Sequence, residues 1–222
     1  MIRLLGGLLL SASVAAFAAE PVRIIETRSV PQKQLPAPPA ATYELNLSLY
    51  TFKDSEWKPN DVITSVLDAL PMIAQCGVAV ASVELRVLEA PRKYFFYSVP
   101  VAREMLREFT VTKPAILFVD DTHSEPAYDA EAIGLSNARE RPEMSNTIWL
   151  AFGTHDLHLA VAHELVHVLS DSGEHSDAPE NLMRPRTGST NTRLTGEQCE
   201  RLRVVAAANG LIAPRAPAKP QK

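Results

Sequence analysis

Hydrophobic and polar residues alternate in two stretches of the chain, and this pattern predicts two β-strands. YELNLSLYTF, residues 43–52, places leucines between polar residues, and GVAVASVELRVLEA, residues 77–90, alternates in the same way. A period of two residues is that of a strand with one face against the core and the other in solvent. The apolar stretches 114–121 and 146–152 predict two buried strands, and the polar stretch 121–143 predicts a long loop that contains one edge strand.

Two helices are predicted in the first half of the chain. The first should be capped by Asn60 or Asp61 and be kinked or divided at Pro71, because proline cannot donate the helical hydrogen bond. The second should extend from Pro100 to Phe109, with the proline in its first turn.

Two further helices are predicted in the second half. One starts at Asp156, and its apolar face consists of Leu159, Ala162, Val166 and Leu169. The other is capped by Thr195 and Gln198, which form a capping box, and it ends at Gly210. Strands and helices interleave along the chain, which indicates an α/β or α+β domain whose sheet is covered by helices.

The first 18 residues are typical of a secretory signal peptide. Arg3 precedes an apolar run from Leu4 to Phe17, and Ala16 and Ala18 are the small residues that a signal peptidase requires. The run is shorter than the roughly 20 residues that span a bilayer. We therefore expect the segment 1–18 to be removed and the mature protein to be exported, periplasmic or extracellular, with no membrane span.

Proline-rich segments flank the part of the chain that is predicted to fold. Residues 19–42 contain five prolines and no periodic pattern, so they predict an extended linker. The folded domain is expected to cover residues 43–212, and the tail 213–222 is expected to be disordered. The chain has 222 residues, of which 46% are hydrophobic, and this is enough for the core of one domain.

The net charge of −4 argues against a nucleic-acid partner, because phosphates are bound by clustered positive charge. The charge is unevenly distributed: residues 119–183 include 13 acidic and 2 basic residues, and residues 184–222 include 8 basic and 2 acidic ones. A solvated acidic surface near a basic tail is favoured over an acidic cleft that attracts cations or basic peptides.

The chain has two cysteines, Cys76 and Cys199. A single pair in an exported protein predicts one disulfide. The disulfide would close a loop of more than a hundred residues and would raise the free energy of unfolding by about 3 to 5 kcal/mol in the chain-entropy model.

Three of the six histidines lie in AHELVHVLSDSGEH, residues 162–175. On a helix, His163 and His167 are one turn apart, so their rings can converge on one ion. Glu164 lies about 100° round the helix, near enough to reach a water on that ion. HELVH therefore meets the geometry of two zinc ligands and a general base. The alternative is two solvent-facing histidines, but the flanking Leu, Ala and Val residues favour a buried helix, where unpaired polar groups are costly.

Catalytic zinc usually takes three protein ligands and leaves a fourth position for water. His175 could be the third ligand, because a chain that reverses at Gly173 can fold back beneath the helix. A carboxylate oxygen of Asp171, Glu174 or Asp177 could take its place. The other histidines, which we expect at the surface or at helix caps, are His123, His155 and His158.

HELVHVLSDSGEHSDAPENLM, residues 163–183, resembles the zinc-binding segment of the metzincin metallopeptidases, in particular the bacterial matrixin-like members. In that family HExxHxxGxxH is followed by a polar loop and a methionine turn. The resemblance implies the following site: zinc ligands His163, His167 and His175, general base Glu164 and Met-turn residue Met183. The sequence departs from the family pattern in two places. Ser170 stands where the family has glycine, and His175 comes two residues late, so either the turn holds an insertion that pivots at Gly173 or His175 is not a ligand.

The resemblance extends loosely over residues 43–210 and implies a single metzincin-like α/β (α+β) domain. In such a domain a mixed, twisted sheet is packed by helices, and the active-site helix is followed by a C-terminal helix. It also implies an exported Zn²⁺-dependent endopeptidase, in which Glu164 takes a proton from a zinc-activated water and the peptide or protein substrate lies extended along an edge strand.

Two alternatives from other classes remain at this point. The first is a non-catalytic zinc-binding or envelope interaction protein, in which Asp171 closes the site as a fourth ligand. The second is a disulfide-bonded module without metal. Cys76 and Gly77 also resemble the propeptide Cys-Gly that blocks zinc in secreted matrixins, but they lie inside the predicted domain, which favours the disulfide.

Overall fold

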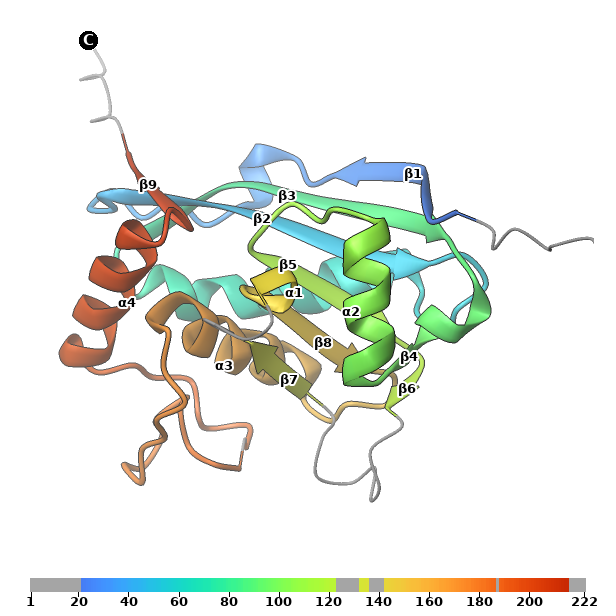
Figure 1. Cartoon of the computed structure of the whole chain (residues 1–222). Helices are drawn as coiled ribbons and strands as arrows, with labels where there is room; N and C mark the ends of the chain where they lie inside the picture. The colour runs from blue at the N-terminus through green and yellow to red at the C-terminus, as the bar shows by residue number, and fades with distance from the viewer. Residues whose placement is uncertain (1–20, 123–131, 136–141, 187, 216–222) are drawn as a thin grey trace, which may run out of the picture.

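A seven-stranded mixed sheet forms the central layer of the computed structural model, which describes residues 21–122, 132–135, 142–186 and 188–215 (Figure 1). The strands of this sheet are β1 (Arg23–Ser29), β2 (Tyr43–Phe52), β3 (Val78–Glu89), β5 (Ala115–Val119), β7 (Ala132–Leu135), β8 (Thr147–Ala151) and β9 (Ile212–Pro214). Two short strands, β4 (Phe96–Tyr97) and β6 (Asp121–Thr122), form a separate pair. The four helices are α1 (Pro59–Ala74), α2 (Val99–Glu108), α3 (Leu157–Ser170) and α4 (Gly196–Ala208).

The strand order is β1-β3-β2-β5-β8-β7, and β9 pairs with β2. The inner strands β3, β2, β5 and β8 are parallel to one another, whereas β1, β7 and β9 are antiparallel to their neighbours. The prediction of an α/β domain with a mixed sheet packed by helices is therefore confirmed. The edge strand expected within residues 121–143 is also confirmed, as β7.

Helices cover both faces of the sheet, and each face has its own hydrophobic core. Leu47 and Leu49 of β2 lie in the core that includes residues of α1, α3 and α4, whereas Tyr50 and Phe52 lie in the core that includes α2. Sequence periodicity predicted a solvated face for β2. Instead Ser48, on the face opposite the leucines, is 6% exposed, because α2 and its neighbouring segments pack over the second half of this strand.

The predicted linker 19–42 differs from the structure. β1 pairs antiparallel with β3, and Val30 and Leu35 are buried in the core. Most side chains of β1 are exposed, so the strand is attached by backbone hydrogen bonds and carries no hydrophobic alternation that a sequence pattern could detect.

The helix boundaries largely agree with the sequence. The N-cap of α1 is Lys58 rather than the predicted Asn60 or Asp61, and the helix starts at Pro59, because proline is well suited to the first helical position. The helix is not divided at Pro71: it continues to Ala74, and Pro71 is exposed where water can replace the lost hydrogen bond.

The C-terminal helix is held at both ends. The capping box of Thr195 and Gln198 is present at its start, and Gly210 has the left-handed φ of +69° just beyond its end. The predicted disulfide between Cys76 and Cys199 is formed and joins the region after α1 to the first turn of α4. The chain then continues into β9, so the predicted disordered tail is ordered at least as far as Pro214.

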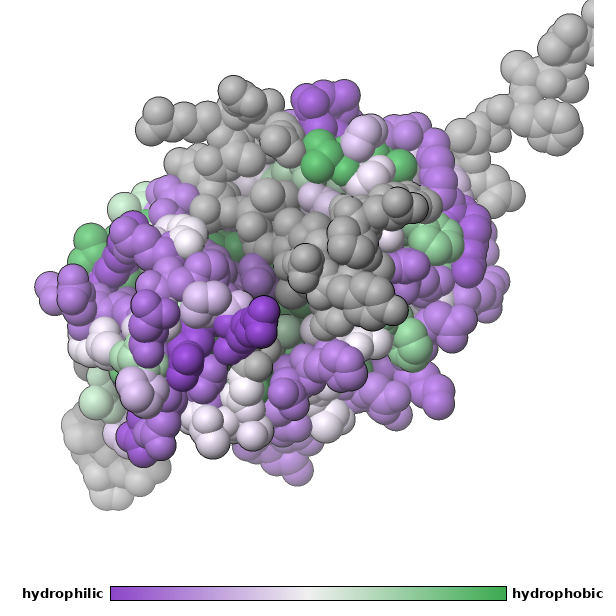
Figure 2. Space-filling view, turned by 90° about the horizontal axis from the view of Figure 1, so that it is seen from below, coloured by the Kyte–Doolittle hydropathy of each residue, from purple (hydrophilic) through white to green (hydrophobic). Residues whose placement is uncertain are grey.

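The predicted signal peptide 1–18 lies outside the described residues. In the part of the chain that is described, no helix has the length and hydrophobicity needed to cross a membrane. The face seen from below in Figure 2 is mostly hydrophilic where its residues are described, with only small hydrophobic areas.

Candidate metal centre

The two histidines of HELVH project from the same side of α3. His163 and His167 are separated by one helical turn, and their ring centroids lie 4.6 Å apart. Their Nε2 atoms are 2.9 Å apart. The arrangement expected from the helical period is therefore present.

The third ring comes from the loop after α3. The ring centroid of His175 lies 5.3 Å from that of His163 and 4.9 Å from that of His167. The possible ligand atoms of the three histidines all lie within 4.8 Å of one another. Within the described ranges this is the only group of three or more His, Cys, Asp or Glu side chains that could share a metal ion.

A left-handed residue at Asp171 brings His175 back towards the helix. Ser170, at the position of the family's glycine, is the last helical residue, and Asp171 follows it with φ of 45°. Aspartate is one of the few residues other than glycine that tolerate this conformation. Gly173, the pivot expected from the sequence, does not have a left-handed φ, and the left-handed residue after α3 is Asp171. The reversal thus begins two residues earlier than the glycine suggested.

Backbone carbonyl groups fix the orientation of the two helical rings. His163 Nδ1 lies 2.8 Å from the carbonyl oxygen of Leu182, and His167 Nδ1 lies 2.6 Å from that of Ser172. A carbonyl oxygen only accepts hydrogen bonds, so we assign the ring proton of each histidine to Nδ1. Each Nε2 is then an acceptor with a lone pair.

This assignment makes the cluster suitable for a cation. In the neutral rings, the Nε2 atoms of His163 and His167 face each other at 2.9 Å with no proton between them to share. A metal ion that accepts both lone pairs relieves this contact. A ligand histidine that donates its other nitrogen to a carbonyl is also the usual arrangement in metal sites.

The protonation states agree with such a role. Burial lowers the pKa of His163 to about 4, against the smaller opposite effect of its hydrogen bond to Leu182. Burial also lowers the pKa of His167. Both rings are therefore neutral near pH 7, as metal ligands must be. Burial decreases from His163 through His167 to the exposed His175, so the cluster is accessible to solvent on the His175 side.

Glu164 and Met183 are the two other residues expected at this site. Glu164 follows His163 on α3 and is half-buried. Met183 is 2% exposed, and its carbonyl accepts a hydrogen bond of 2.8 Å from the backbone N–H of Ser176, the residue after His175. The chain at Met183 and the loop that carries His175 are thus directly connected.

The alternative ligands lie outside the cluster. Glu174 forms an ion pair with Arg201 of α4, and neither Asp171 nor Asp177 belongs to the group of possible ligands. Of the other histidines, His155 is exposed and His158 half-buried, and neither belongs to the cluster. His123 lies outside the described residues.

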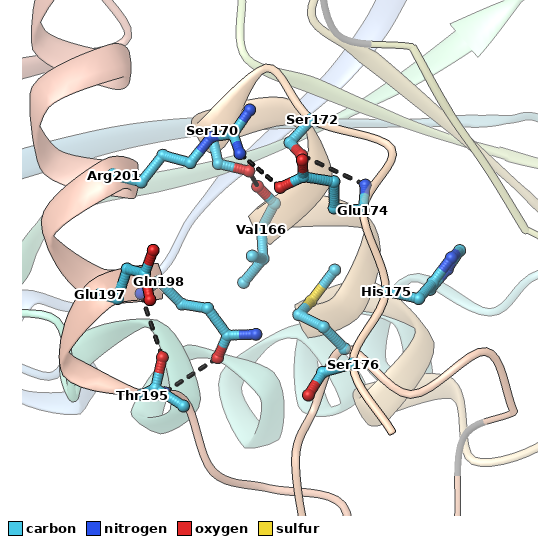
Figure 3. A pocket seen from close by; sticks show the side chains of 11 residues that line it. Val166, Ser170, Ser172, Glu174, His175, Ser176, Thr195, Glu197, Gln198 and Arg201 are labelled. Atoms are coloured by element: carbon cyan, nitrogen blue, oxygen red, sulfur yellow. Dashed lines mark hydrogen bonds and ion pairs between the residues drawn. The ribbon is translucent and has the colours of Figure 1, made fainter. Parts of the chain in front are cut away.

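A pocket of about 280 Å³ adjoins the cluster (Figure 3). It lies between the second half of α3, the loop 172–176, Met183 and the first turns of α4. In Figure 3 the ring of His175 points away from the side chains of α4 that line the pocket. His175 is nevertheless one of the residues that line the pocket.

Sequence reasoning did not identify the carbonyl groups of Ser172 and Leu182. Any residue provides a backbone carbonyl, so no side chain at these positions marks the contact with the histidine rings. Only the distance between the loops and α3 reveals them.

Comparison with known proteins gives a similar structure but no similar sequence. No protein-family model matches the chain, and no curated protein matches it. Among solved structures, the crystal structure of metalloproteinase-II from Bacteroides fragilis is similar, with a TM-score of 0.51 and 21% sequence identity over 77% of this chain and 55% of that one. The chain thus spans about half the length of that metalloproteinase. At this identity the similarity shows a shared fold.

Proposed function

We propose that the protein is an exported zinc-dependent endopeptidase. In this proposal the zinc ligands are His163, His167 and His175, and Glu164 is the general base. The observation that carries it is the convergence of three imidazoles, two of which have Nδ1 bonded to backbone carbonyls and Nε2 directed into the cluster. A fold shared with a metalloproteinase from Bacteroides fragilis supports it.

The chemistry follows from the donor set. When bound, zinc lowers the pKa of a coordinated water towards 7 and polarises the carbonyl of the peptide bond. The Glu164 carboxylate takes the proton from the attacking water and passes it to the leaving nitrogen as the C–N bond breaks. The carbonyl groups of Leu182 and Ser172 keep the rings of His163 and His167 in the tautomer that presents Nε2. Met183 would support the site from the methionine turn.

The substrate in this proposal is an extended peptide. β7 is the last strand in the sheet order beyond β8, and it lies against α3, so a peptide can add to its outer edge as a further strand. Export is supported by the disulfide between Cys76 and Cys199, since such bonds persist in oxidising compartments. Removal of residues 1–18 as a signal peptide belongs to the same proposal.

A Glu164→Gln variant tests this function. It should keep about one zinc per chain and lose peptide hydrolysis by a factor of at least about 100, as expected when a general base is removed. Zinc is measured by elemental analysis after dialysis, and hydrolysis is measured on unfolded casein and on quenched fluorescent peptides.

The same experiment distinguishes the alternatives. A non-catalytic zinc protein would show equal zinc contents and no hydrolysis in either form. A module without metal would contain no zinc. Either result contradicts the proposed peptidase.

A further inference from the structure

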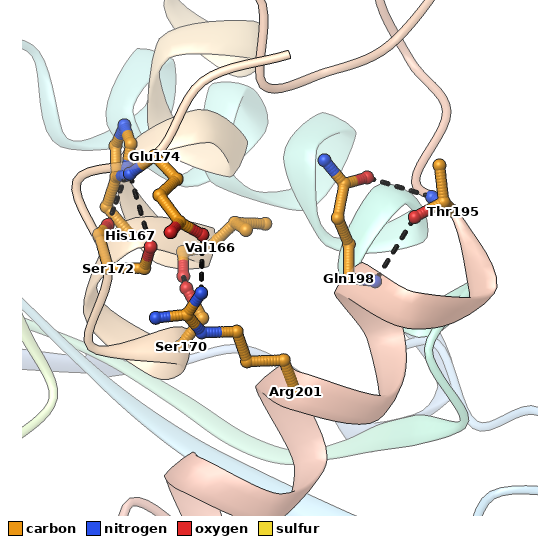
Figure 4. Close-up of polar contacts among 8 residues, drawn as sticks. All are labelled: Val166, His167, Ser170, Ser172, Glu174, Thr195, Gln198 and Arg201. Atoms are coloured by element: carbon orange, nitrogen blue, oxygen red, sulfur yellow. Dashed lines mark hydrogen bonds and ion pairs between the residues drawn. The ribbon is translucent and has the colours of Figure 1, made fainter.

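Helix α4 contacts both loops that hold the candidate metal centre. Gln198 and Arg201 are three residues apart, so they lie on one side of the helix. In Figure 4 the side chain of Arg201 extends towards Glu174 in the loop after α3, and that of Gln198 lies beside Thr195 at the start of α4. Arg201 forms an exposed ion pair with Glu174. Gln198 makes the more buried contact, to Asn181.

The side chains of Gln198 and Asn181 form a reciprocal amide pair. Asn181 Nδ2 donates to Gln198 Oε1 at 2.9 Å, and Gln198 Nε2 donates to Asn181 Oδ1 at 3.2 Å. Gln198 Oε1 also accepts from the backbone N–H of Thr195 at 2.9 Å, as part of the capping box. The start of α4 is thus linked to a residue that is only 3% exposed.

Asn181 in turn holds the methionine turn. Its Oδ1 accepts the backbone N–H of Met183 at 2.9 Å, across Leu182. The carbonyl of Leu182, in the middle of this turn, is the group that accepts from His163 Nδ1. A continuous path of hydrogen bonds and one peptide unit, that between Leu182 and Met183, therefore connects Gln198 to the ring of His163.

We propose that Asn181 and Gln198 are positioning residues of the metal centre. Together they hold the carbonyl of Leu182 where it keeps the proton of His163 on Nδ1 and directs Nε2 into the cluster. This inference rests on the proposed function in one respect, namely that the three histidines bind zinc. It does not require peptide hydrolysis.

Removal of either amide should weaken zinc binding. In Asn181→Ala the backbone N–H of Met183 loses its partner, and in Gln198→Ala the amide of Asn181 loses both of its bonds to α4. Loss of an outer-shell partner typically weakens metal binding about 10- to 100-fold. Since the amides act on His163 through the turn, we expect the lower end, about 10-fold, for each variant. The double variant should be little weaker than either single one, because the two residues form one network.

Thr195→Ala is the matched control. It removes the other half of the capping box, in which Thr195 Oγ1 accepts from the backbone N–H of Gln198, and leaves the pair of Gln198 and Asn181 intact. It should destabilise the helix start and leave zinc affinity unchanged. Gln198→Glu keeps the oxygen that accepts from Asn181 Nδ2 but puts a carboxylate oxygen in place of the donor to Asn181 Oδ1, so two acceptors face each other and its zinc affinity should also be lower than that of wild type.

The measurement is the dissociation constant for zinc, from competition with a chromophoric chelator, on the full chain with its disulfide formed. Thermal unfolding of the zinc-free proteins shows which variants are folded. If an alanine variant does not fold, the zinc affinity of Gln198→Glu tests the inference in its place. The cobalt-loaded proteins give a second readout, because altered ligand geometry changes the visible absorption of Co²⁺.

The outcomes are distinct. Weaker zinc binding and an altered cobalt spectrum in the Asn181 and Gln198 variants, with Thr195→Ala like wild type, support the inference even if no peptide is cut. Wild-type affinity in the variants, or equal weakening in Thr195→Ala, overturns it and leaves the proposed function intact. A wild-type protein that binds no zinc overturns both.

Discussion

The disulfide between Cys76 and Cys199 should contribute a large share of the stability of this domain. The two residues are separated by 123 positions in the chain. In the chain-entropy model a loop of this length restricts the unfolded chain by about 16 cal/mol/K, which is about 5 kcal/mol at 25 °C. The bond lies between buried residues, with Cys76 at 0% and Cys199 at 7% exposure, so a reductant reaches it mainly when the chain opens.

Urea unfolding of the zinc-free protein, followed by tryptophan fluorescence, measures this contribution. For a domain of this size the free energy of unfolding falls by about 2 to 3 kcal/mol per molar urea, so loss of the disulfide should lower the midpoint by about 2 M. The double variant Cys76→Ala/Cys199→Ala tests it directly. The reduced wild type, which keeps both sulfur atoms in the core, separates loss of the cross-link from loss of packing. A midpoint for the reduced wild type within about 0.5 M of the oxidised protein would refute the argument, because the cross-link would then contribute less than about 1.5 kcal/mol.

Three further predictions concern the candidate metal centre and its loop. His175→Ala should weaken zinc binding by a factor of at least about 100, whereas the control Asp177→Ala should not. Chelator competition measures both affinities, and equal affinities in the two variants would exclude His175 as a ligand. Because the folded-state pKa of His163 is about 4, below its unfolded value, the neutral ring stabilises the fold above pH 6.5 and this contribution is lost as the pH falls towards 4. The zinc-free protein should therefore lose about 2 kcal/mol between pH 7 and pH 5 in urea unfolding, and a His163→Gln variant should lose clearly less. Asp171→Gly should stabilise the protein by about 0.5 to 1 kcal/mol, because glycine adopts a φ of 45° without strain, while Gly173→Ala should not destabilise it, because an added Cβ meets no atom there and the φ is not left-handed. If thermal unfolding showed no gain in stability for Asp171→Gly and a loss for Gly173→Ala, the turn would lie at Gly173.

The sequence predicted most of the elements because their signals are local. The helical period of α3 and the capping box of α4 each depend on residues within a few positions, so neither required knowledge of the tertiary contacts. The apolar composition of β5 and β8 identified buried strands in the same way. The convergence of His163 and His167 likewise follows from one turn of helix.

The elements that were missed depend on contacts between distant segments. β1 is held by backbone pairing with β3, and its exposed side chains show no pattern. The turn after α3 uses Asp171 although Gly173 is the better residue for a left-handed φ, because the position of the reversal is set by where the helix ends. The amide pair of Asn181 was not predicted either, because its partner Gln198 lies 17 residues away in the chain.

The use of main-chain carbonyls at Ser172 and Leu182 has a consequence for evolutionary comparison. Substitutions at either position preserve the acceptor of the histidine ring, so mutation can replace these residues over long periods without altering the donor atoms around the ion. Proteins with the same arrangement can therefore diverge until alignment methods no longer detect their kinship. The spatial arrangement of three imidazoles and two carbonyl oxygens is therefore a better criterion for finding related proteins than a sequence motif.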